Sequence, residues 1–313
     1  MDANPVMPDL IACGESLIDM VPDDRGCFCP HPGGAPANVA VAAVRLGQSA
    51  AFVGKRGEDA FGEQLQDHLA QCGVDTTAFT TTREAKTALA FIQYQAEQVP
   101  EFSFYRDPGA DEMLRPQDVP ARLLDATRAF HFGSISLYSE PAAGATRAAA
   151  DKVRAAGGLV SYDPNLRPAI MATRHGALEA AQSAIPRAHV IKVSSEEVLQ
   201  LSGMTDESDG LAFLFDHGIR LAAVTRGPDG ATVANAQGRV EGAGEPVSVV
   251  DTTGAGDAFT AGLLTFLLER DLGPEDLPGL GPDTLARLGH WANRVAASST
   301  TRAGATEGLI RPD

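Results

Sequence analysis

The segment Asp251-Thr-Thr-Gly-Ala-Gly-Asp257 places two glycines between two carboxylates. The apolar run at 247–250 before it predicts a strand, and the strongly apolar run at 258–268 after it predicts a helix. Glycines at a strand-to-helix junction let backbone N–H groups converge on one point, and the helix N-terminus adds the positive end of its dipole. Residues 251–257 therefore predict a cradle for an anion such as a phosphate group.

Asp257 is unexpected in such a cradle, because its carboxylate would repel a phosphate. It would have a use there if it took a proton from an attacking hydroxyl while the cradle held a transferring phosphoryl group. The alternative is that Asp257 only caps the helix, since aspartate is favoured at N-caps. Taken by itself, this one segment favours the capping role.

Two common nucleotide-binding patterns are absent from the sequence. The Walker pattern G-x-x-x-x-G-K-[ST] does not occur, which argues against a P-loop protein. The fingerprint G-x-G-x-x-G is missing from the first strand-to-helix turn, which weakens the case for a dehydrogenase.

The chain is strongly acidic, with a formal net charge of −16. This charge repels phosphate backbones and anionic lipids, so we expect neither nucleic acid nor a membrane as a partner. An ATP site would have to rely on local donors, helix ends and a metal ion. No apolar run approaches the roughly 20 residues of a membrane span, and the start, Met-Asp-Ala-Asn-Pro, lacks a secretory signal pattern. We therefore expect a cytoplasmic protein.

The cysteines and histidines show no spacing typical of a metal site. Cys13, Cys27, Cys29 and Cys72 form no paired C-x-x-C set, and we expect reduced thiols. Cys27 and Cys29 would share one face of a strand, so a regulatory thiol pair is the alternative. His131 lies in an apolar run and is expected to be a hydrogen-bonded core residue.

Short apolar runs alternate with helical patterns along most of the chain, and 44% hydrophobic residues suffice for a large core. Strands are expected at 10–14, 50–53, 129–132, 159–162, 190–193 and 221–225, and helices at 35–46 and 61–71. This alternation argues for a parallel sheet covered on both faces. The stretches at about 17–32 and 85–106 alternate without helices and predict antiparallel strands of a small projecting sheet, a natural lid. We expect one domain over residues 1–313.

Two segments resemble the signatures of one protein family. Asp251-Thr-Thr-Gly-Ala-Gly-Asp-Ala-Phe259 is similar to the C-terminal signature of the ribokinase-like (PfkB) carbohydrate kinases. Gly33-Gly-Ala-Pro-Ala-Asn38, with the run at 39–47, is similar to their N-terminal signature. The resemblance extends from Gly14-Glu-Ser-Leu-Ile-Asp19 to Thr301-Arg-Ala-Gly304. It implies an α/β fold, a three-layer sandwich with a mainly parallel central sheet, plus a small β-sheet lid.

Within this family the chain most resembles the fructokinases. The similar segments are Phe102-Ser-Phe-Tyr-Arg-Asp-Pro-Gly-Ala-Asp111, Phe130-His-Phe-Gly-Ser-Ile-Ser-Leu137, Ser161-Tyr-Asp-Pro-Asn-Leu-Arg167 and Ile191-Lys-Val-Ser-Ser-Glu-Glu-Val198. Kinases of 2-keto-3-deoxygluconate share several of these stretches.

The resemblance implies a role for each matching residue of the two signatures. Asp257 matches the catalytic base, and the residues matching the anion hole around the transferring phosphoryl group are Gly254, Ala255 and Gly256. The residues matching the sugar-binding signature are Gly33, Gly34 and Asn38. Glycines let a sugar approach the backbone, and an asparagine can donate to and accept from hydroxyls. A tight turn with Asn38 in the first helical turn is the structural alternative.

Two further residues match sugar contacts of the family. Asp19 lies at the end of the first expected strand, where ligands gather in open α/β sheets; its alternative is a solvated residue at the lid hinge. Arg106 matches a fructokinase arginine facing the sugar, with a surface salt bridge as its alternative. An arginine fork suits paired oxygens, so Arg106 could also favour an acidic sugar.

The resemblance also implies contacts to ATP and its Mg²⁺. The matching residues are Arg167, Lys192, Ser194, Glu197, Thr225, Gly227, Gly230 and Asn293. Ser194 stands where the family's N-x-x-E pattern has asparagine, which puts a direct role of this position in doubt, whereas Glu197 keeps the carboxylate that organises Mg²⁺. Arg167 is the best candidate for contacting transferring charge, and Asn293 could instead be a polar residue facing solvent. The positions matching a monovalent cation site, and hence potassium activation, are Asp251, Thr253, Ser299, Arg302 and Gly304.

These observations favour an ATP-dependent sugar kinase that converts D-fructose to fructose 6-phosphate. A second hypothesis keeps the chemistry and changes the sugar to 2-keto-3-deoxygluconate, ribose or another ketose. A third is a sugar or nucleotide sensor that has lost catalysis, against which the retention of Asp257 and Glu197 argues. Because exposed edges of lid sheets often pair, a homodimer through the lid is a further expectation.

Overall fold

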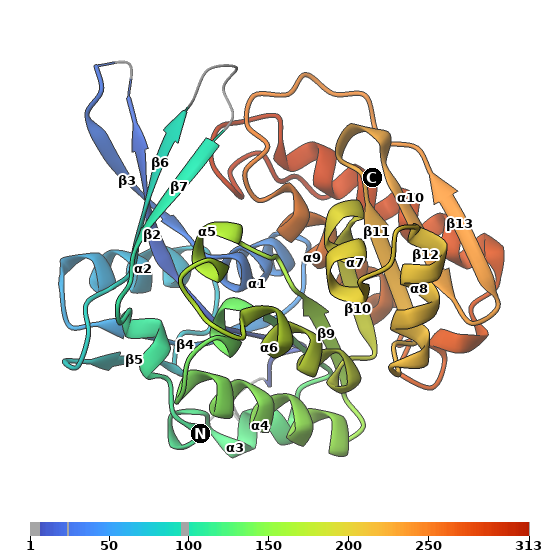
Figure 1. The fold of residues 1–313 in the computed structure, drawn as a ribbon, viewed down its shortest axis with the longest axis horizontal. Coiled ribbons are helices and arrows are strands. Elements are labelled where there is room, and N and C mark those ends of the chain that lie inside the picture. Colours follow the sequence, from blue (N-terminus) through green and yellow to red (C-terminus); the bar gives the residue numbers. More distant parts are fainter. Residues whose placement is uncertain (1–6, 24, 95–99, 313) are drawn as a thin grey trace, which may run out of the picture.

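The computed structural model describes residues 7–23, 25–94 and 100–312. Its centre is a nine-stranded sheet (Figure 1). In spatial order the strands are β13 (Gly238–Gly242), β12 (Ala231–Asn235), β11 (Leu221–Thr225), β10 (Val190–Ser194), β9 (Leu159–Asp163), β8 (Ala129–Gly133), β1 (Leu10–Cys13), β4 (Ala50–Gly57) and β5 (Phe79–Thr82). All neighbours pair in parallel except β11 with β12 and β12 with β13. The prediction of a mainly parallel sheet is therefore confirmed.

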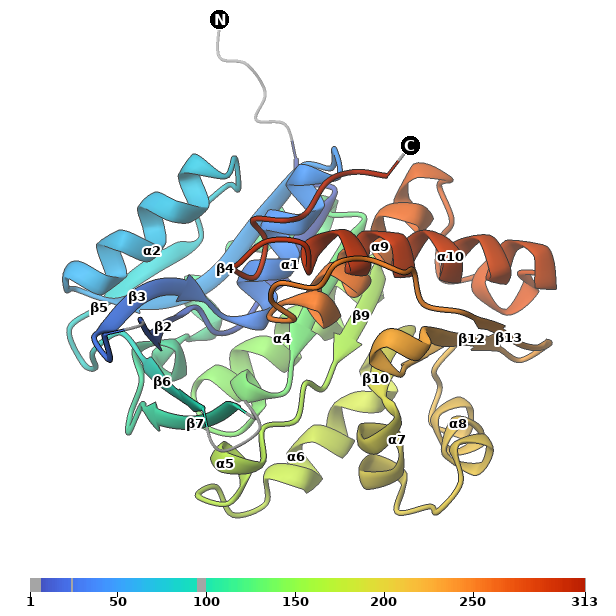
Figure 2. The same cartoon turned by 90° about the horizontal axis from the view of Figure 1, so that it is seen from above.

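Helices cover both faces of this sheet, which makes the three expected layers (Figure 2). One face packs against α1 (Ala35–Arg45), α2 (Ala60–Gln71), α9 (Ala255–Glu269) and α10 (Pro282–Ser299). The other packs against α3 (Ala121–Ala126), α4 (Ala142–Ala155), α6 (Ala177–Ala184), α7 (Ser195–Ser202) and α8 (Glu207–Asp216). The central strand β1 divides its side chains accordingly, because Leu10 and Ala12 enter the first core and Ile11 and Cys13 the second.

Shorter helices lie in the connections. They are α5 (Pro168–Met171) and the 3-10 helices η2 (Ala110–Met113), η3 (Pro116–Asp118), η4 (Ile135–Leu137), η5 (Ile185–Arg187), η6 (Gly227–Asp229) and η7 (Leu277–Gly279). Among the described residues, no helix combines the length and the hydropathy that a membrane span requires.

A second, smaller sheet projects from the main body (Figure 1). Its order is β3 (Phe28–Gly33), β2 (Leu17–Pro22), β6 (Leu89–Tyr94) and β7 (Pro100–Tyr105). These strands lie in the two stretches expected to form the lid. The sequence suggested antiparallel pairing throughout, but the two hairpins meet through β2 and β6, which are parallel.

Two predicted elements near the glycine-rich segment require correction. Residues 247–250 form no strand, and Val249 and Val250 are largely exposed. Pro246 next to them cannot donate to a strand ladder, and β-branched side chains alone do not make a strand without a neighbour to pair with. The following helix, α9, begins at Ala255 rather than at residue 258.

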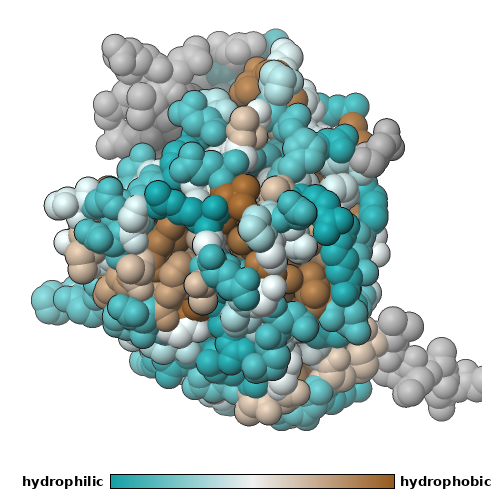
Figure 3. Space-filling view, turned by 90° about the vertical axis from the view of Figure 1, so that its right-hand side faces the viewer, coloured by the Kyte–Doolittle hydropathy of each residue, from teal (hydrophilic) through white to brown (hydrophobic). Residues whose placement is uncertain are grey.

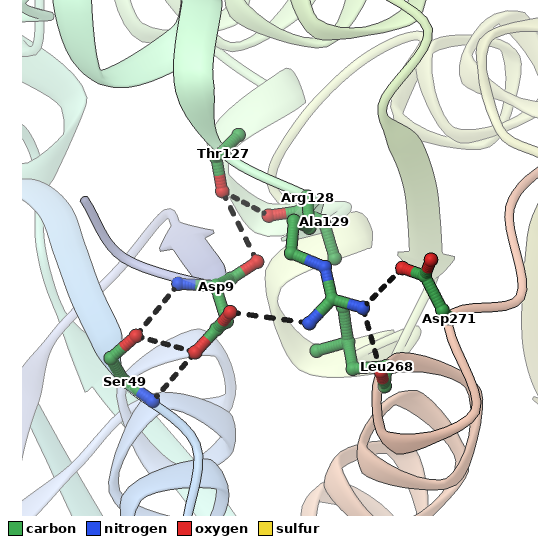
Figure 4. A network of polar contacts seen from close by, with 7 residues as sticks. All are labelled: Asp9, Ser49, Thr127, Arg128, Ala129, Leu268 and Asp271. Carbon is green, nitrogen blue, oxygen red and sulfur yellow. Dashed lines mark hydrogen bonds and ion pairs between the residues drawn. The ribbon is translucent and has the colours of Figure 1, made fainter.

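The far end of α9 is fixed by a polar network (Figure 4). Arg128 donates to the carbonyl of Leu268 at 2.6 Å and to Asp271 at 2.9 Å, and it also contacts Asp9 at 3.2 Å. Asp9 in turn accepts from the hydroxyl of Ser49 at 2.6 Å. The network ties the C-terminal end of α9 to the start of β1, so the opposite end of α9 is held at the carboxyl edge of the sheet.

The side of the molecule formed by β13, α8 and α10 carries a mixed surface. Figure 3 shows hydrophobic patches there that are separated by hydrophilic side chains. Such interruption keeps an outer helix layer solvated while its inner stripe packs on the sheet.

Candidate active site

Two adjoining cavities lie where the carboxyl ends of the parallel strands meet the small sheet. The larger, about 510 Å³, is bounded by α9, α10 and the segments after β11 and β13. The smaller, about 270 Å³, is bounded by residues of β2 and β7 and by the starts of α1 and α9. Thr252, Ala255 and Gly256 line both cavities, so the two meet at the glycine-rich segment. We call them the larger cavity and the smaller cavity.

Asp257 lies at this junction as the third residue of α9. The N-cap of α9 is Gly254, so Asp257 does not cap the helix. Its carboxylate accepts a hydrogen bond of 2.8 Å from Nδ2 of Asn38, which belongs to the first turn of α1. Burial raises the pKa of Asp257 to about 6, although the Asn38 hydrogen bond lowers it. The geometry therefore fits a carboxylate that exchanges a proton near neutral pH.

The backbone around Asp257 requires glycine. Gly254 has a φ of 76°, and a side chain there would meet Cα of Ala305 at 2.8 Å. The N–H of Ala255 donates back to Thr252, whereas those of Gly256 and Asp257 belong to the first helical turn, whose amides have no partner within their own helix. The Asp257 amide is therefore a further candidate donor for the anion hole predicted at 254–256.

A buried cation adjoins these amides. A Cβ on Gly256 would lie 2.9 Å from Nζ of Lys192, which itself contacts Asp163 at 3.1 Å. Burial lowers the pKa of Lys192, but the carboxylates of Asp163 and Glu197 outweigh burial and raise it. The ammonium therefore stays charged, and Lys192 lines the smaller cavity together with Arg167.

Asp19 lines the same cavity, but from a different element than expected. It belongs to β2 of the small sheet rather than to the end of β1, because the chain leaves the main sheet after Cys13. Burial raises its pKa to about 7, with Arg167 opposing and Asp257 reinforcing the rise. A side chain on Gly33 would collide with the Asp19 carboxylate, which explains the glycine at this position.

Arg106 does not reach the smaller cavity, contrary to the sequence-based expectation. It is buried and forms an ion pair with Asp111, also buried. The ion pair is therefore buried rather than a surface salt bridge, and Arg106 is not among the residues that line the smaller cavity. The carboxylate that does line the cavity on this side is Glu15, which sequence reasoning missed. Its only signal was its place within Gly14-Glu-Ser-Leu-Ile-Asp19, directly after a buried strand.

The larger cavity contains half of the residues that were expected at the nucleotide. Thr225, Gly227, Gly230 and Asn293 all line it. Asn293 is buried rather than solvent-facing, and its Nδ2 donates to the carbonyl of Ala243 at 3.0 Å. It thereby holds the segment after β13 against α10, as one wall of the cavity.

Ser194 and Glu197 form a capping box at the start of α7. The Ser194 hydroxyl accepts from the N–H of Glu197, and the Glu197 carboxylate accepts from the N–H of Ser194 at 2.8 Å. The other Glu197 oxygen accepts from the N–H of Leu166 at 2.6 Å. The capping role explains how serine can replace the family's asparagine, and neither residue lines the two cavities.

The residues predicted for a monovalent cation lie around two loops that Asp251 joins. Its carboxylate accepts from the N–H of Thr253 and from that of Gly304, each at 2.9 Å. Ser299 is buried at the end of α10, whereas Arg302 is exposed. Elsewhere, His131 is buried and lies 3.1 Å from the Ser161 hydroxyl, as expected of a core histidine.

Comparison with known proteins gives a consistent family. Residues 6–311 match the family described as pfkB family carbohydrate kinase. The chain is 39% identical to probable fructokinase-4 of Arabidopsis thaliana, over 96% of this chain and 93% of that protein. A fructokinase with bound ATP from Xylella fastidiosa superposes with a TM-score of 0.90 at 32% identity, covering 96% of this chain and 94% of the other. A double mutant of a fructokinase from Vibrio cholerae O395, in fructose, ADP and potassium ion bound form, gives 0.86 at 32%, covering 97% and 96%.

Proposed function

Because this chain belongs to the pfkB family of carbohydrate kinases, we propose that it transfers the γ-phosphoryl group of ATP to D-fructose, giving fructose 6-phosphate and ADP. The observation that carries this proposal is the buried carboxylate of Asp257 at the junction of the two cavities. A sugar in the smaller cavity and a nucleotide in the larger one would meet there. Fructose as the acceptor is supported by the similarity to named fructokinases, one of them solved with fructose.

Each residue at the junction has its own role in the proposed reaction. Asp257 takes the proton of the attacking sugar hydroxyl, for which a carboxylate with a pKa of about 6 suits neutral conditions. The first amides of α9, Lys192 and Arg167 stabilise negative charge on the phosphoryl group as it moves from ADP to the sugar oxygen. Closure of the small sheet over the site would keep water from competing as acceptor.

Magnesium fits this site as a companion of ATP rather than as a resident ion. Among the described residues, no group of three or more His, Cys, Asp or Glu side chains could hold a metal ion. Each Glu197 oxygen already accepts one backbone N–H but retains lone-pair capacity toward the water shell of Mg²⁺. When bound with ATP, Mg²⁺ neutralises charge on the phosphates.

The proposal also includes a potassium site, a homodimer and a cytoplasmic location. The loops joined by Asp251 support a potassium site built mainly from backbone carbonyls, in keeping with the potassium-bound Vibrio cholerae relative. The exposed rings of Phe28 and Tyr105 on the small sheet support a homodimer through that sheet. The exposed free thiol of Cys27 supports a reducing location such as the cytoplasm.

An ADP-release assay with fructose, ribose and 2-keto-3-deoxygluconate, run side by side with Mg²⁺ATP, tests the proposed function. We expect the highest kcat/KM for fructose. A higher kcat/KM for either other sugar would replace fructose as the substrate, and no ADP release with any sugar would contradict kinase activity.

A further inference from the structure

Glu15 is a buried carboxylate to which the proposed mechanism gives no task. It follows β1, is only 2% exposed, and lines the smaller cavity together with Asp19 and Asp257. Its Oε2 atom has no hydrogen-bond partner among the described residues. A buried carboxylate oxygen left without a donor is costly, because it loses its hydration and gains nothing in return. A donor supplied by a bound molecule would remove this cost.

Glu15 has charged neighbours, among them Arg106 and Asp111. Arg106 lies close enough to lower the pKa of Glu15, but burial outweighs it and, with Asp111 and Asp257, raises that pKa to about 7. Arg106 is itself paired with Asp111. The nearby Glu112 is paired with Arg174 at 2.9 Å. Arg106 is thus ion-paired within the wall, although its Nε and Nη1 atoms have no hydrogen-bond partner among the described residues, and the group that this wall presents to the cavity is the Glu15 carboxyl.

The two cations that line the smaller cavity are Lys192 and Arg167. Lys192 lies against Gly256 at the start of α9 and contacts Asp163. Arg167 lowers the pKa of Asp19 and that of Asp257. Both cations are therefore placed for a phosphoryl group near Asp257.

We propose that Glu15 is a specificity-determining residue: its free oxygen accepts a hydrogen bond from a hydroxyl of a neutral sugar, and its charge excludes acidic sugars. This inference rests on the proposed sugar kinase function and narrows its substrate class. A hydroxyl donating to a carboxylate makes a charge-assisted hydrogen bond, stronger than one between neutral groups. A substrate carboxylate in the same place would face a like charge and leave the Glu15 oxygen without a donor.

Two substitutions distinguish the hydrogen bond made by Glu15 from the effect of its charge. Glu15→Gln keeps the reach of the side chain and removes its charge, whereas Glu15→Asp keeps the charge and shortens the reach by one methylene. Glu179→Gln is the matched control, because Glu179 is exposed on α6, away from both cavities. The readout is kcat/KM for fructose and for 2-keto-3-deoxygluconate at a pH above the pKa of Glu15, where its carboxylate is charged, with thermal melting to verify that each variant is folded.

We expect Glu15→Gln to lower kcat/KM for fructose by about tenfold or more and to lower the ratio of fructose to acidic-sugar kcat/KM by at least about tenfold. Glu15→Asp should also lose activity with fructose while it changes that ratio much less, and the control should match the wild type. Equal losses on both sugars in a folded Glu15→Gln variant would assign Glu15 a purely structural role and overturn the proposal.

The failure of this inference can be told from the failure of the proposed function. A wild-type protein that uses an acidic sugar better than any neutral one would overturn the inference and leave kinase activity intact. A wild-type protein that prefers a neutral sugar other than fructose would replace fructose as substrate. The inference would then be supported if Glu15→Gln lowers the ratio measured with that sugar.

Discussion

The two cavities that meet at Asp257 recognise their ligands by different means. The smaller cavity carries the carboxylates Glu15, Asp19 and Asp257, and burial raises the pKa of each. The larger cavity is lined mainly by glycines, apolar side chains and backbone, with Asn293 as a wall-forming amide. We therefore expect charge to govern binding in the smaller cavity, the proposed sugar site, and shape to govern binding in the larger cavity, the proposed nucleotide site. Substitutions in the smaller cavity should alter rates strongly, and those in the larger one should alter mainly the KM for ATP.

The largest effect is expected from Asp257→Asn. The amide can still accept the hydrogen bond from Asn38, so the fold should be retained, but the proton acceptor is lost. We expect kcat with fructose to fall by about 10²- to 10⁴-fold, with little change in the KM for ATP. Steady-state ADP release measures both constants, and a kcat within a fewfold of wild type would remove Asp257 from the mechanism.

A smaller but still large effect is expected from Lys192→Met. This change removes a cation next to the α9 amides and leaves the buried Asp163 without its partner. We expect kcat to fall by about 10- to 100-fold, and the protein to lose about 3 kcal/mol or more of stability.

The matched control is Lys55→Met, because Lys55 is also buried and forms an ion pair of 2.6 Å with the partly buried Asp118, away from both cavities. Denaturant unfolding should show a loss of stability in both variants. Kinetics should show a loss of turnover only in Lys192→Met. Equal turnover in the two variants would reduce Lys192 to a structural residue.

The smallest effect is expected in the larger cavity, from Asn293→Ala. Loss of the bond to the Ala243 carbonyl loosens one wall of the cavity without touching the reacting groups. We expect the KM for ATP to rise by about 5-fold, as one lost hydrogen bond implies, with kcat nearly unchanged. A drop in kcat larger than the rise in KM would break the contrast between the two cavities.

Sequence reasoning anticipated the residues that meet at Asp257 better than it anticipated the surroundings of Glu15. Local turn requirements and family signatures both specify Asp257, Asn38 and the glycines of their two segments, so these residues could be predicted. The environments of Glu15 and Arg106 could not, because they depend on how the residues after β7 pack behind β1. No local pattern reports that packing.

The fold shows the same division. Buried strands such as β1 and β8, and the helices that cover them, follow from apolar runs with clear ends. Sequence patterns did not indicate the antiparallel strands β12 and β13 at one side of the sheet, and they wrongly indicated a strand at 247–250. Short segments of this kind become strands only when a neighbouring edge is available, which is a tertiary property.

The central claim is that Asp257 takes the proton of the sugar hydroxyl, and the pH dependence of single-turnover phosphoryl transfer tests it most directly. A carboxylate with a raised pKa acts as a base only when ionised. With saturating fructose and Mg²⁺ATP, the wild-type rate should therefore fall as the pH drops below about 6 and level off above it. The slow residual rate of Asp257→Asn should lack this step. The same step in both proteins would contradict the assignment of Asp257 as the base.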